Sequence, residues 1–344
     1  MQRESRLLFV LPLACGSLGC VPDIEDRVSI ISAPRVIALR SDPPEAAQGE
    51  RVQVTAAIAA PDGSQPEVDF ALCLDRKPLT ELGPVSAECL VSPEEVPDVV
   101  TPLERGESTP LGVPPNACTL FGPERPNPKP GEPAPRPVDP DQSGGFHQPV
   151  LAWLEDEVTL GSVRLSCPLS GASRDVTIEF NQRYRRNENP GISSFERVLP
   201  NGSGEALGAD TPSASPGEQV RLRVRVPGCP SEPVCGDGIC GAREDRTNCA
   251  QDCDNPKGCG GAEPYVVYDR ESIALKDMRE QLVAAWYATD GRFAVENSAP
   301  EPGDLEALDN VWTAPTTPGR VLFWVVVRDD RGGVDWRSGE LRIE

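Results

Sequence analysis

Apolar and polar residues alternate along many short stretches of this chain, and no stretch shows strong helical periodicity. A period of two is typical of strands that bury one face and expose the other. The predicted strands of the first half are Arg35–Leu39, Val68–Leu74, Val150–Leu154, Val163–Cys167 and Val176–Phe180. Those of the second half are Tyr265–Tyr268, Leu282–Ala288 and Val321–Val327.

An internal repeat indicates how these strands are organised. Gly49–Ala56 aligns with Gly217–Val224 at an offset of 168 residues, and each copy is a turn followed by strict alternation. Such alternation is expected of an antiparallel strand that packs one face on a core. The repeat therefore predicts two similar domains in tandem.

Short strands joined by glycine and proline turns favour a β-sandwich. Trp286 lies inside a predicted strand, where an immunoglobulin-like domain commonly has a buried tryptophan. We therefore expect an all-β protein with two tandem immunoglobulin-like β-sandwich domains, at residues 33–188 and 189–344. A segment 1–19 and a tether 20–32 precede them.

Three further tryptophans, Trp312, Trp324 and Trp336, allow two interpretations. Exposed aromatic rings could form a platform for sugar rings. At strand positions, however, such residues more often pack in the core or across strands, and we favour that interpretation.

The first nineteen residues have the parts of a bacterial signal peptide: Arg3 and Arg6, an apolar run at Leu7–Ala14, and small residues before Cys20. They resemble a lipoprotein signal, which implies that Cys20 begins the mature protein and carries lipid such as palmitate. Cleavage at Cys15 instead would leave Cys20 as an odd thiol, whereas loss of residues 1–19 leaves ten cysteines that can all pair. The alternatives are an ordinary secretory signal or an uncleaved membrane anchor. The apolar run Leu7–Ala14 is too short for such an anchor, because a helix that spans a bilayer takes about 20 apolar residues.

Composition indicates a location outside the cytoplasm. Ten paired cysteines would not persist against cytosolic glutathione. The formal charge is −21, which argues against binding to nucleic acid or to anionic lipid surfaces. Val21 after Cys20 resembles the sorting rule of some Gram-negative bacteria, which implies the outer membrane, on its periplasmic face or at the cell surface.

Eleven prolines lie between Pro110 and Pro140. This density favours extended polyproline II, so we expect a projecting excursion at about residues 105–148 of the first domain. It could be a ligand for an aromatic groove, but a solvated loop is the more common outcome. Among the first domain's cysteines we favour the pairs Cys73 with Cys89 and Cys118 with Cys167, the second of which would close the excursion at its ends.

A cysteine-rich insertion at residues 229–259 interrupts the second domain. It contains Cys229, Cys235, Cys240, Cys249, Cys253 and Cys259. With no C-x-x-C spacing and no nearby histidine, disulfides are expected rather than zinc. Asp237, Glu244 and Asp252 supply oxygen ligands suited to calcium, although they could also be solvated acids that keep a disulfide knot soluble.

Several segments resemble known families. Cys235–Cys240, with the acids and cysteines after it, is similar to a small cysteine-rich repeat of secreted bacterial proteins. The rest resembles bacterial surface lipoproteins with tandem immunoglobulin-like domains, on segments Pro34–Leu39, Pro43–Glu45, Phe70–Cys73, Gly144–Val150 and Trp324–Gly333. The closing part, from Trp312 to Gly333, resembles the last two strands of such a domain. These resemblances imply fold and location, and they imply no reaction.

An enzyme is disfavoured. His147 is the only histidine, and the chain has no G-x-S-x-G elbow. We expect a non-catalytic, lipid-anchored envelope protein that presents sandwich loops to a protein or polysaccharide. The alternatives are a structural spacer of an envelope assembly and, third, a hydrolase with an unrecognised carboxylate pair.

Overall fold

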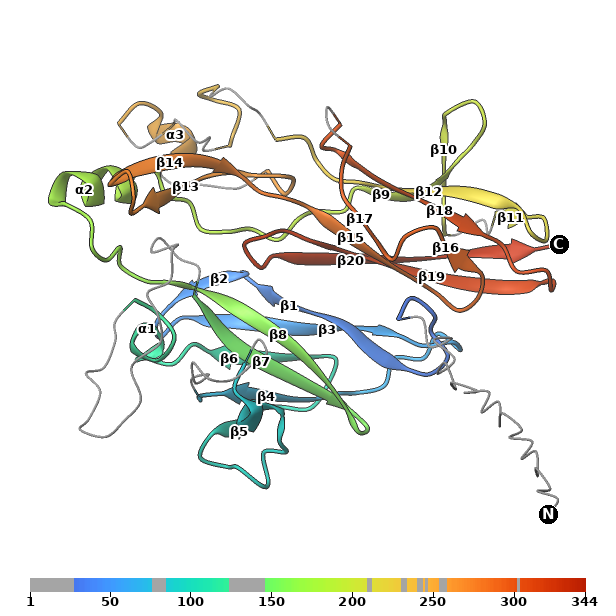
Figure 1. Cartoon of the computed structure of the whole chain (residues 1–344), viewed down its shortest axis with the longest axis horizontal. Coiled ribbons are helices and arrows are strands. Elements are labelled where there is room, and N and C mark those ends of the chain that lie inside the picture. Colours follow the sequence, from blue (N-terminus) through green and yellow to red (C-terminus); the bar gives the residue numbers. More distant parts are fainter. Residues whose placement is uncertain are drawn as a thin grey trace, which may run out of the picture.

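The computed structural model describes residues 28–75, 85–123, 146–208, 212–229, 234–239, 244, 247–253, 259–301 and 304–344. Most of the regular structure is strand, as predicted (Figure 1). Cys15, Cys20 and Cys240 lie outside the described residues. Within those residues, no helix combines the length and apolar character that crossing a bilayer requires.

The first sandwich consists of two sheets with strand orders β1-β3-β6 and β2-β8-β7-β4-β5. Its core includes Val52, Phe70 and Leu165, each on the inward face of a strand along which side chains alternate. The strands are β1 (Arg35–Asp42), β2 (Glu45–Ala47), β3 (Arg51–Ala59), β4 (Asp69–Cys73), β5 (Val100–Pro102), β6 (Ser108–Gly112), β7 (His147–Leu154) and β8 (Glu157–Ser166).

The second sandwich has strand orders β10-β9-β12-β18-β16 and β11-β20-β19-β15-β17. Trp286, Trp312 and Phe323 fill its core, so the packing interpretation of the first two is confirmed. The strands are β9 (Ser194–Val198), β10 (Gly204–Ala206), β11 (Ser213–Ala214), β12 (Gln219–Arg225), β15 (Val283–Ala288), β16 (Arg292–Phe293), β17 (Asn297–Ser298), β18 (Ala307–Thr313), β19 (Gly319–Arg328) and β20 (Val334–Ile343).

The repeat seen in the sequence is present in the geometry. Gly49 and Gly217 both turn the chain with positive φ, at 80° and 75°. The residue after each glycine accepts a hydrogen bond on its carboxylate, from Ala47 N to Glu50 at 2.8 Å and from Ser215 N to Glu218 at 2.7 Å. In each sandwich a short strand before this turn pairs in parallel with the last strand, β2 with β8 and β11 with β20.

A third apolar cluster joins the two sandwiches. It contains Ala57 and Ala59 of β3 with Trp324 and Val326 of β19, all buried. Because side chains alternate along β19, Phe323 enters the sandwich core while Trp324 enters this interface. The uninterrupted apolar run of β19 is therefore explained by burial on both faces. Trp336, which is half-buried, packs against the same cluster.

The remaining elements lie outside the sandwiches. They are a 3-10 helix (Ala87–Leu90), α1 (Ala117–Leu120), α2 (Arg174–Arg183), α3 (Ala250–Cys253), and a hairpin of β13 (Pro264–Asp269) with β14 (Ala274–Arg279). The hairpin makes a two-stranded sheet of its own.

The predicted strand Val176–Phe180 is wrong, because this segment lies in α2. Alternation of Val176, Ile178 and Phe180 suggested a period of two, yet only Phe180 is buried. Ser173 begins the helix by accepting a hydrogen bond from Val176 N at 3.4 Å, and Asp175 and Arg183 suit the helix dipole at its two ends.

Two other predictions need correction. Ser108–Gly112, which was assigned to the proline-rich excursion, forms β6 at the edge of its sheet, where the missing N–H of Pro110 is tolerated. The closing β19 is not the last strand, because Val334–Ile343 forms β20 beside it. Residues 124–145 of the proline-rich stretch lie outside the described residues.

Candidate functional site at the distal end

The chain direction defines two ends of the molecule. Ile31 N donates to Ala288 O at 2.8 Å, so the first described residues reach one end of β15. The other end of β15, Val283, pairs with Arg328 next to the β19–β20 turn. We call the first the N-terminal end and the second, with the turn Asp329–Gly333, the distal end.

Both insertions join the sandwiches at the distal end. Cys118 of α1 is bonded to Cys167 directly after β8, and Leu165 N donates to Phe146 O at 2.8 Å. The proline-rich stretch therefore leaves and re-enters the fold there. The helices α1, α2 and α3 and the β13–β14 hairpin gather at this end, while the C-terminus lies at the other (Figure 1).

A buried ion pair links the two sandwiches at the distal end. Glu45 of β2 and Arg331 of the β19–β20 turn have side-chain exposures of 0% and 1%, and their Oε2 and Nη2 atoms lie 3.4 Å apart. Arg164 of β8 places its Nε 3.4 Å from the same Glu45 oxygen. Tyr184 donates its hydroxyl to Glu45 Oε1 at 2.6 Å. Burial raises the pKa of Tyr184 to about 12, so its proton is retained for this bond.

Arg331 also binds the second sandwich and the connecting chain. Its Nη1 donates to Glu280 Oε1 at 3.1 Å and its Nη2 to the Arg185 carbonyl at 2.7 Å. The guanidinium lies 4.8 Å from the centre of the Tyr265 ring, a cation–π distance. Burial opposes its charge, but Tyr184 and the Glu45 and Glu280 carboxylates hold the pKa of Arg331 above its usual value.

Two neighbouring buried carboxyl groups have raised pKa values. Glu263 Oε1 accepts hydrogen bonds from Cys259 N at 2.8 Å and Gly260 N at 3.2 Å. Burial nevertheless raises the pKa of Glu263 to about 7. Burial, helped by the Asp329 and Glu263 carboxylates, raises the pKa of Glu280 to about 9. Glu263 N donates to Glu280 Oε2 at 3.0 Å, so both groups belong to one polar layer.

The segment between the sandwiches is fixed by the β19–β20 turn. Asp329 Oδ1 accepts from the amides of Arg331 and Gly333, each at 2.8 Å, and Asn187 Nδ2 donates to it at 3.2 Å. Burial raises the pKa of Asp329. A β-carbon at Gly333 would lie 2.9 Å from the Glu188 carbonyl, so only glycine allows this approach.

The disulfides pair as follows. Cys73 bonds Cys89 and Cys118 bonds Cys167, which are the two pairs favoured from the sequence. In the insertion, the pairs are Cys229 with Cys259 and Cys235 with Cys249. Cys253 is also disulfide-bonded.

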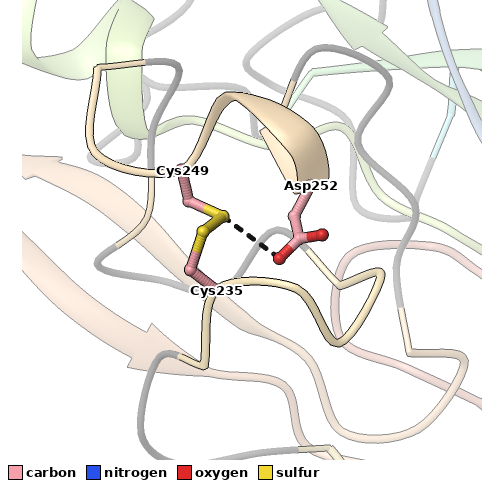
Figure 2. A group of neighbouring side chains, drawn as sticks. All are labelled: Cys235, Cys249 and Asp252. Carbon is pink, nitrogen blue, oxygen red and sulfur yellow. Dashed lines mark hydrogen bonds between the residues drawn. A yellow bond between two sulfur atoms is a disulfide. The ribbon is translucent and has the colours of Figure 1, made fainter.

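Asp252 organises the turn of the insertion. Its carboxylate accepts from Gly236 N at 2.5 Å and Gly238 N at 3.2 Å, so it ties the glycine-rich turn to α3. It also lies 3.1 Å from Cys249 Sγ (Figure 2). A disulfide sulfur has no proton to donate and is no thiolate ligand, so Cys235, Cys249 and Asp252 are a structural contact rather than a metal centre.

The three predicted calcium ligands have separate roles. Asp237 is exposed and accepts from Ile239 N at 2.8 Å, while Glu244 is buried and its carbonyl accepts from Arg185 Nη2 at 2.8 Å. Among the described residues, Asp237, Glu244 and Asp252 do not form one group of carboxylates at ligand distance. Calcium binding here stays a prediction.

A cleft lies between α2 and the insertion. Its volume is about 470 Å³, and its lining includes Ile178 and Gln182 of α2, Arg185 after the helix, and Thr247 and Cys253 of the insertion. The helix is held beside the β13–β14 hairpin by an ion pair of Arg183 with Asp277. This end of the molecule thus combines a cleft with a rigid polar support.

His147 lies on β7, away from the cleft. Its Nδ1 is 3.4 Å from Ser162 Oγ on the neighbouring strand. A β-carbon at Gly332 would lie 3.3 Å from His147 Cε1, so the ring packs against the β19–β20 turn. His147 is the first residue of β7, and these contacts give its ring a packing role.

Comparisons with known proteins give a distant likeness only. No protein-family model matches the chain, and no curated protein matches it. It is similar to dimeric latent PorU from Porphyromonas gingivalis, with 12% identity, a TM-score of 0.21, and coverage of 91% of this chain and 24% of that chain. It is also similar to the adhesin InvE from Yersinia pseudotuberculosis, with 7% identity, a TM-score of 0.20, and coverage of 89% of this chain and 58% of that chain.

A third similar structure is the native conformation of alpha-2-macroglobulin from E. coli, with 9% identity, a TM-score of 0.22, and coverage of 89% of this chain and 16% of that chain. This chain thus spans less than two thirds of each of the three. At these TM-scores the likeness carries no argument about activity or partner.

Proposed function

We propose that this protein is a non-catalytic, lipid-anchored protein of the cell envelope that presents its distal end to a protein or polysaccharide partner. The observation that carries the proposal is the position of the two insertions. Both join the fold at the distal end, whereas the first described residues pair with Ala288 at the N-terminal end. A lipid on Cys20 would therefore attach the molecule by the end opposite its insertions.

Rigidity supports presentation. The apolar cluster between the sandwiches includes Trp324 and Val326, and the ion pair of Glu45 with Arg331 fixes the same interface at the distal end. Loops on a rigid sandwich are a frequent design for binding, because the scaffold holds them without an ordering cost at each encounter.

The absence of catalysis is part of the proposal. His147 Nδ1 lies 3.4 Å from Ser162 Oγ, its ring packs against the β19–β20 turn, and the sequence has no G-x-S-x-G elbow. The carboxyl groups with raised pKa, Glu263 and Glu280, bind backbone amides and Arg331. They therefore support the fold rather than face a substrate.

Site-specific photo-crosslinking in intact cells tests the proposal. Crosslinkers at the exposed Ile178 and Ile273 sample the distal end, and one at exposed Ser64, in the turn after β3, samples the N-terminal end as a matched control. We expect one partner to be captured from Ile178 and Ile273 and not from Ser64. Capture from Ser64 alone would contradict the proposal.

The continuous interface also favours a second candidate, a spacer that holds an envelope assembly at a set height. A spacer should tolerate replacement of residues 230–258 by a short linker and should fail when either sandwich is deleted. A presenting protein should already lose its partner on the first change. Recovery of the crosslinked assembly after each change separates the two.

A further inference from the structure

One wall of the cleft between α2 and the insertion carries two carboxamide side chains. Ile178, Asn181 and Gln182 of α2 all line it. Their spacing of three and four residues places them on one face of the helix. Within the part of the chain that the structure describes, the carboxamides of Asn181 and Gln182 have no hydrogen-bond partner. Each offers a donor pair and an acceptor to a ligand.

The cationic side chain that lines the cleft is engaged in hydrogen bonds. Arg185 is the one ionised side chain among the described lining residues, and it donates to the carbonyls of Gln182, Tyr184 and Glu244 at 2.8 to 2.9 Å. The hydroxyl of Tyr184 is taken by Glu45 at 2.6 Å. Thr247 and Cys253 complete the wall with a hydroxyl and a disulfide sulfur. Nη1 and Nη2 of Arg185 are thus both engaged, Nη2 also with Cys253 Sγ at 3.4 Å, so the described lining offers a ligand polar groups without a carboxylate or a free cationic donor.

We propose that this cleft is a binding site for a neutral saccharide unit. The inference rests on the proposed function and names the partner's chemistry. Adjacent hydroxyls of a sugar can each donate and accept, which matches two carboxamides on one helix face. The volume of about 470 Å³ falls in the range of roughly 300–1,000 Å³ that small-ligand sites occupy.

Other occupants fit less well. An extended peptide gains affinity by pairing with a strand edge, and the described walls here are a helix and a disulfide-bonded loop. A folded protein partner usually needs buried aromatic or arginine anchors, whereas the exposed apolar residue here is Ile178 alone. An anionic saccharide would find Nη1 and Nη2 of Arg185, the one cation among the described lining residues, already engaged, and it would be repelled by the acidic molecule.

The test is binding of the detergent-solubilised full chain to an array of neutral glycans that covers hexose, deoxyhexose and N-acetylhexosamine linkages, with oligogalacturonate as the anionic control. A positive glycan is then titrated by calorimetry. Asn181→Ala with Gln182→Ala should weaken binding at least tenfold. Both changes are on an exposed helix face and raise helix propensity, so the fold should persist.

The matched control is Arg174→Ala with Asp175→Ala on the same helix, which should leave the affinity unchanged because neither residue lines the cleft. No binding to any neutral glycan, equal weakening by the control pair, or preference for oligogalacturonate would overturn the saccharide site. The proposed function would survive such a result if Ile178 and Ile273 still captured a protein in cells. Loss of that capture together with glycan binding would instead reject the proposed function.

Discussion

The raised pKa of Glu263 makes the stability of this protein depend on pH in a direction that can be predicted. Its carboxyl is 5% exposed, and burial raises its pKa from 4.5 to about 7. The folded state therefore prefers the protonated form. The stabilisation is fully present below pH 4.5 and is lost as the pH rises through 7, because ionised Glu263 is tolerated better in the unfolded chain.

The magnitude follows from the size of the shift. One pKa unit corresponds to about 1.4 kcal/mol, so the full shift corresponds to about 3 kcal/mol. Most of this falls between pH 5 and pH 8, where Glu263 alone should lower the free energy of unfolding by about 2 to 3 kcal/mol. Glu280, whose pKa is raised to about 9, should continue the decline at higher pH.

Glu263→Gln should remove this part of the pH dependence. A glutamine oxygen can still accept from the amides of Cys259 and Gly260, so the fold and the two hydrogen bonds should persist. The variant should match the wild type near pH 5 and be more stable by about 2 to 3 kcal/mol at pH 8. The exposed Glu271→Gln, in the turn of the hairpin that follows Glu263, is the matched control and should follow the wild type.

Urea unfolding followed by tryptophan fluorescence measures this, with the disulfides kept oxidised. The quantity to compare is the difference between the Glu263→Gln and wild-type curves at each pH, since Glu280 and Asp329 act in both proteins. Parallel curves from pH 5 to pH 8 would refute the argument that a buried, protonated Glu263 supports the distal end.

Three further predictions concern other features. Arg331→Ala should lower the free energy of unfolding by about 3–5 kcal/mol, because it takes one of two buried cations from Glu45, leaving Arg164, and breaks the hydrogen bonds to Glu280 and the Arg185 carbonyl; a loss below 1 kcal/mol by urea unfolding would contradict this. Cys20→Ser should abolish metabolic lipid labelling and Cys15→Ser should not; labelling that persists in Cys20→Ser would exclude the anchor. Calcium should raise the melting temperature, and Asp237→Asn with Glu244→Gln should remove the rise; an identical melting curve in chelator would exclude binding.

Local patterns predicted the sheets well because each sandwich strand has one face in a core. The repeat at Gly49 and Gly217 predicted equivalent turns, and both adopt positive φ before a strand. The same rule failed for α2. Alternation at Val176, Ile178 and Phe180 resembles a strand when burial is not known, whereas the capping by Ser173 was the signal for a helix.

The polar layer at the distal end could not be predicted in the same way. Glu45 and Arg331 are 286 residues apart, and neither lies in a pattern that distinguishes it from a solvated charge. Only the glycines of the turn after Asp329 gave a local signal, since Gly333 is required by the close Glu188 carbonyl. Likewise, the acids of the insertion were visible, but the capture of Asp252 by Gly236 and Gly238 amides depends on the folded loop.

The buried charges have a different role from the apolar cluster beside them. An interface of Ala57, Ala59, Trp324 and Val326 supplies attraction, but apolar contacts are not directional and would permit small rotations of one sandwich against the other. The ion pair of Glu45 with Arg331 resists them, because any displaced arrangement separates two buried charges of opposite sign. We infer that this layer fixes the orientation of the two sandwiches, and with it the position of the α2 cleft relative to the lipid-anchored end.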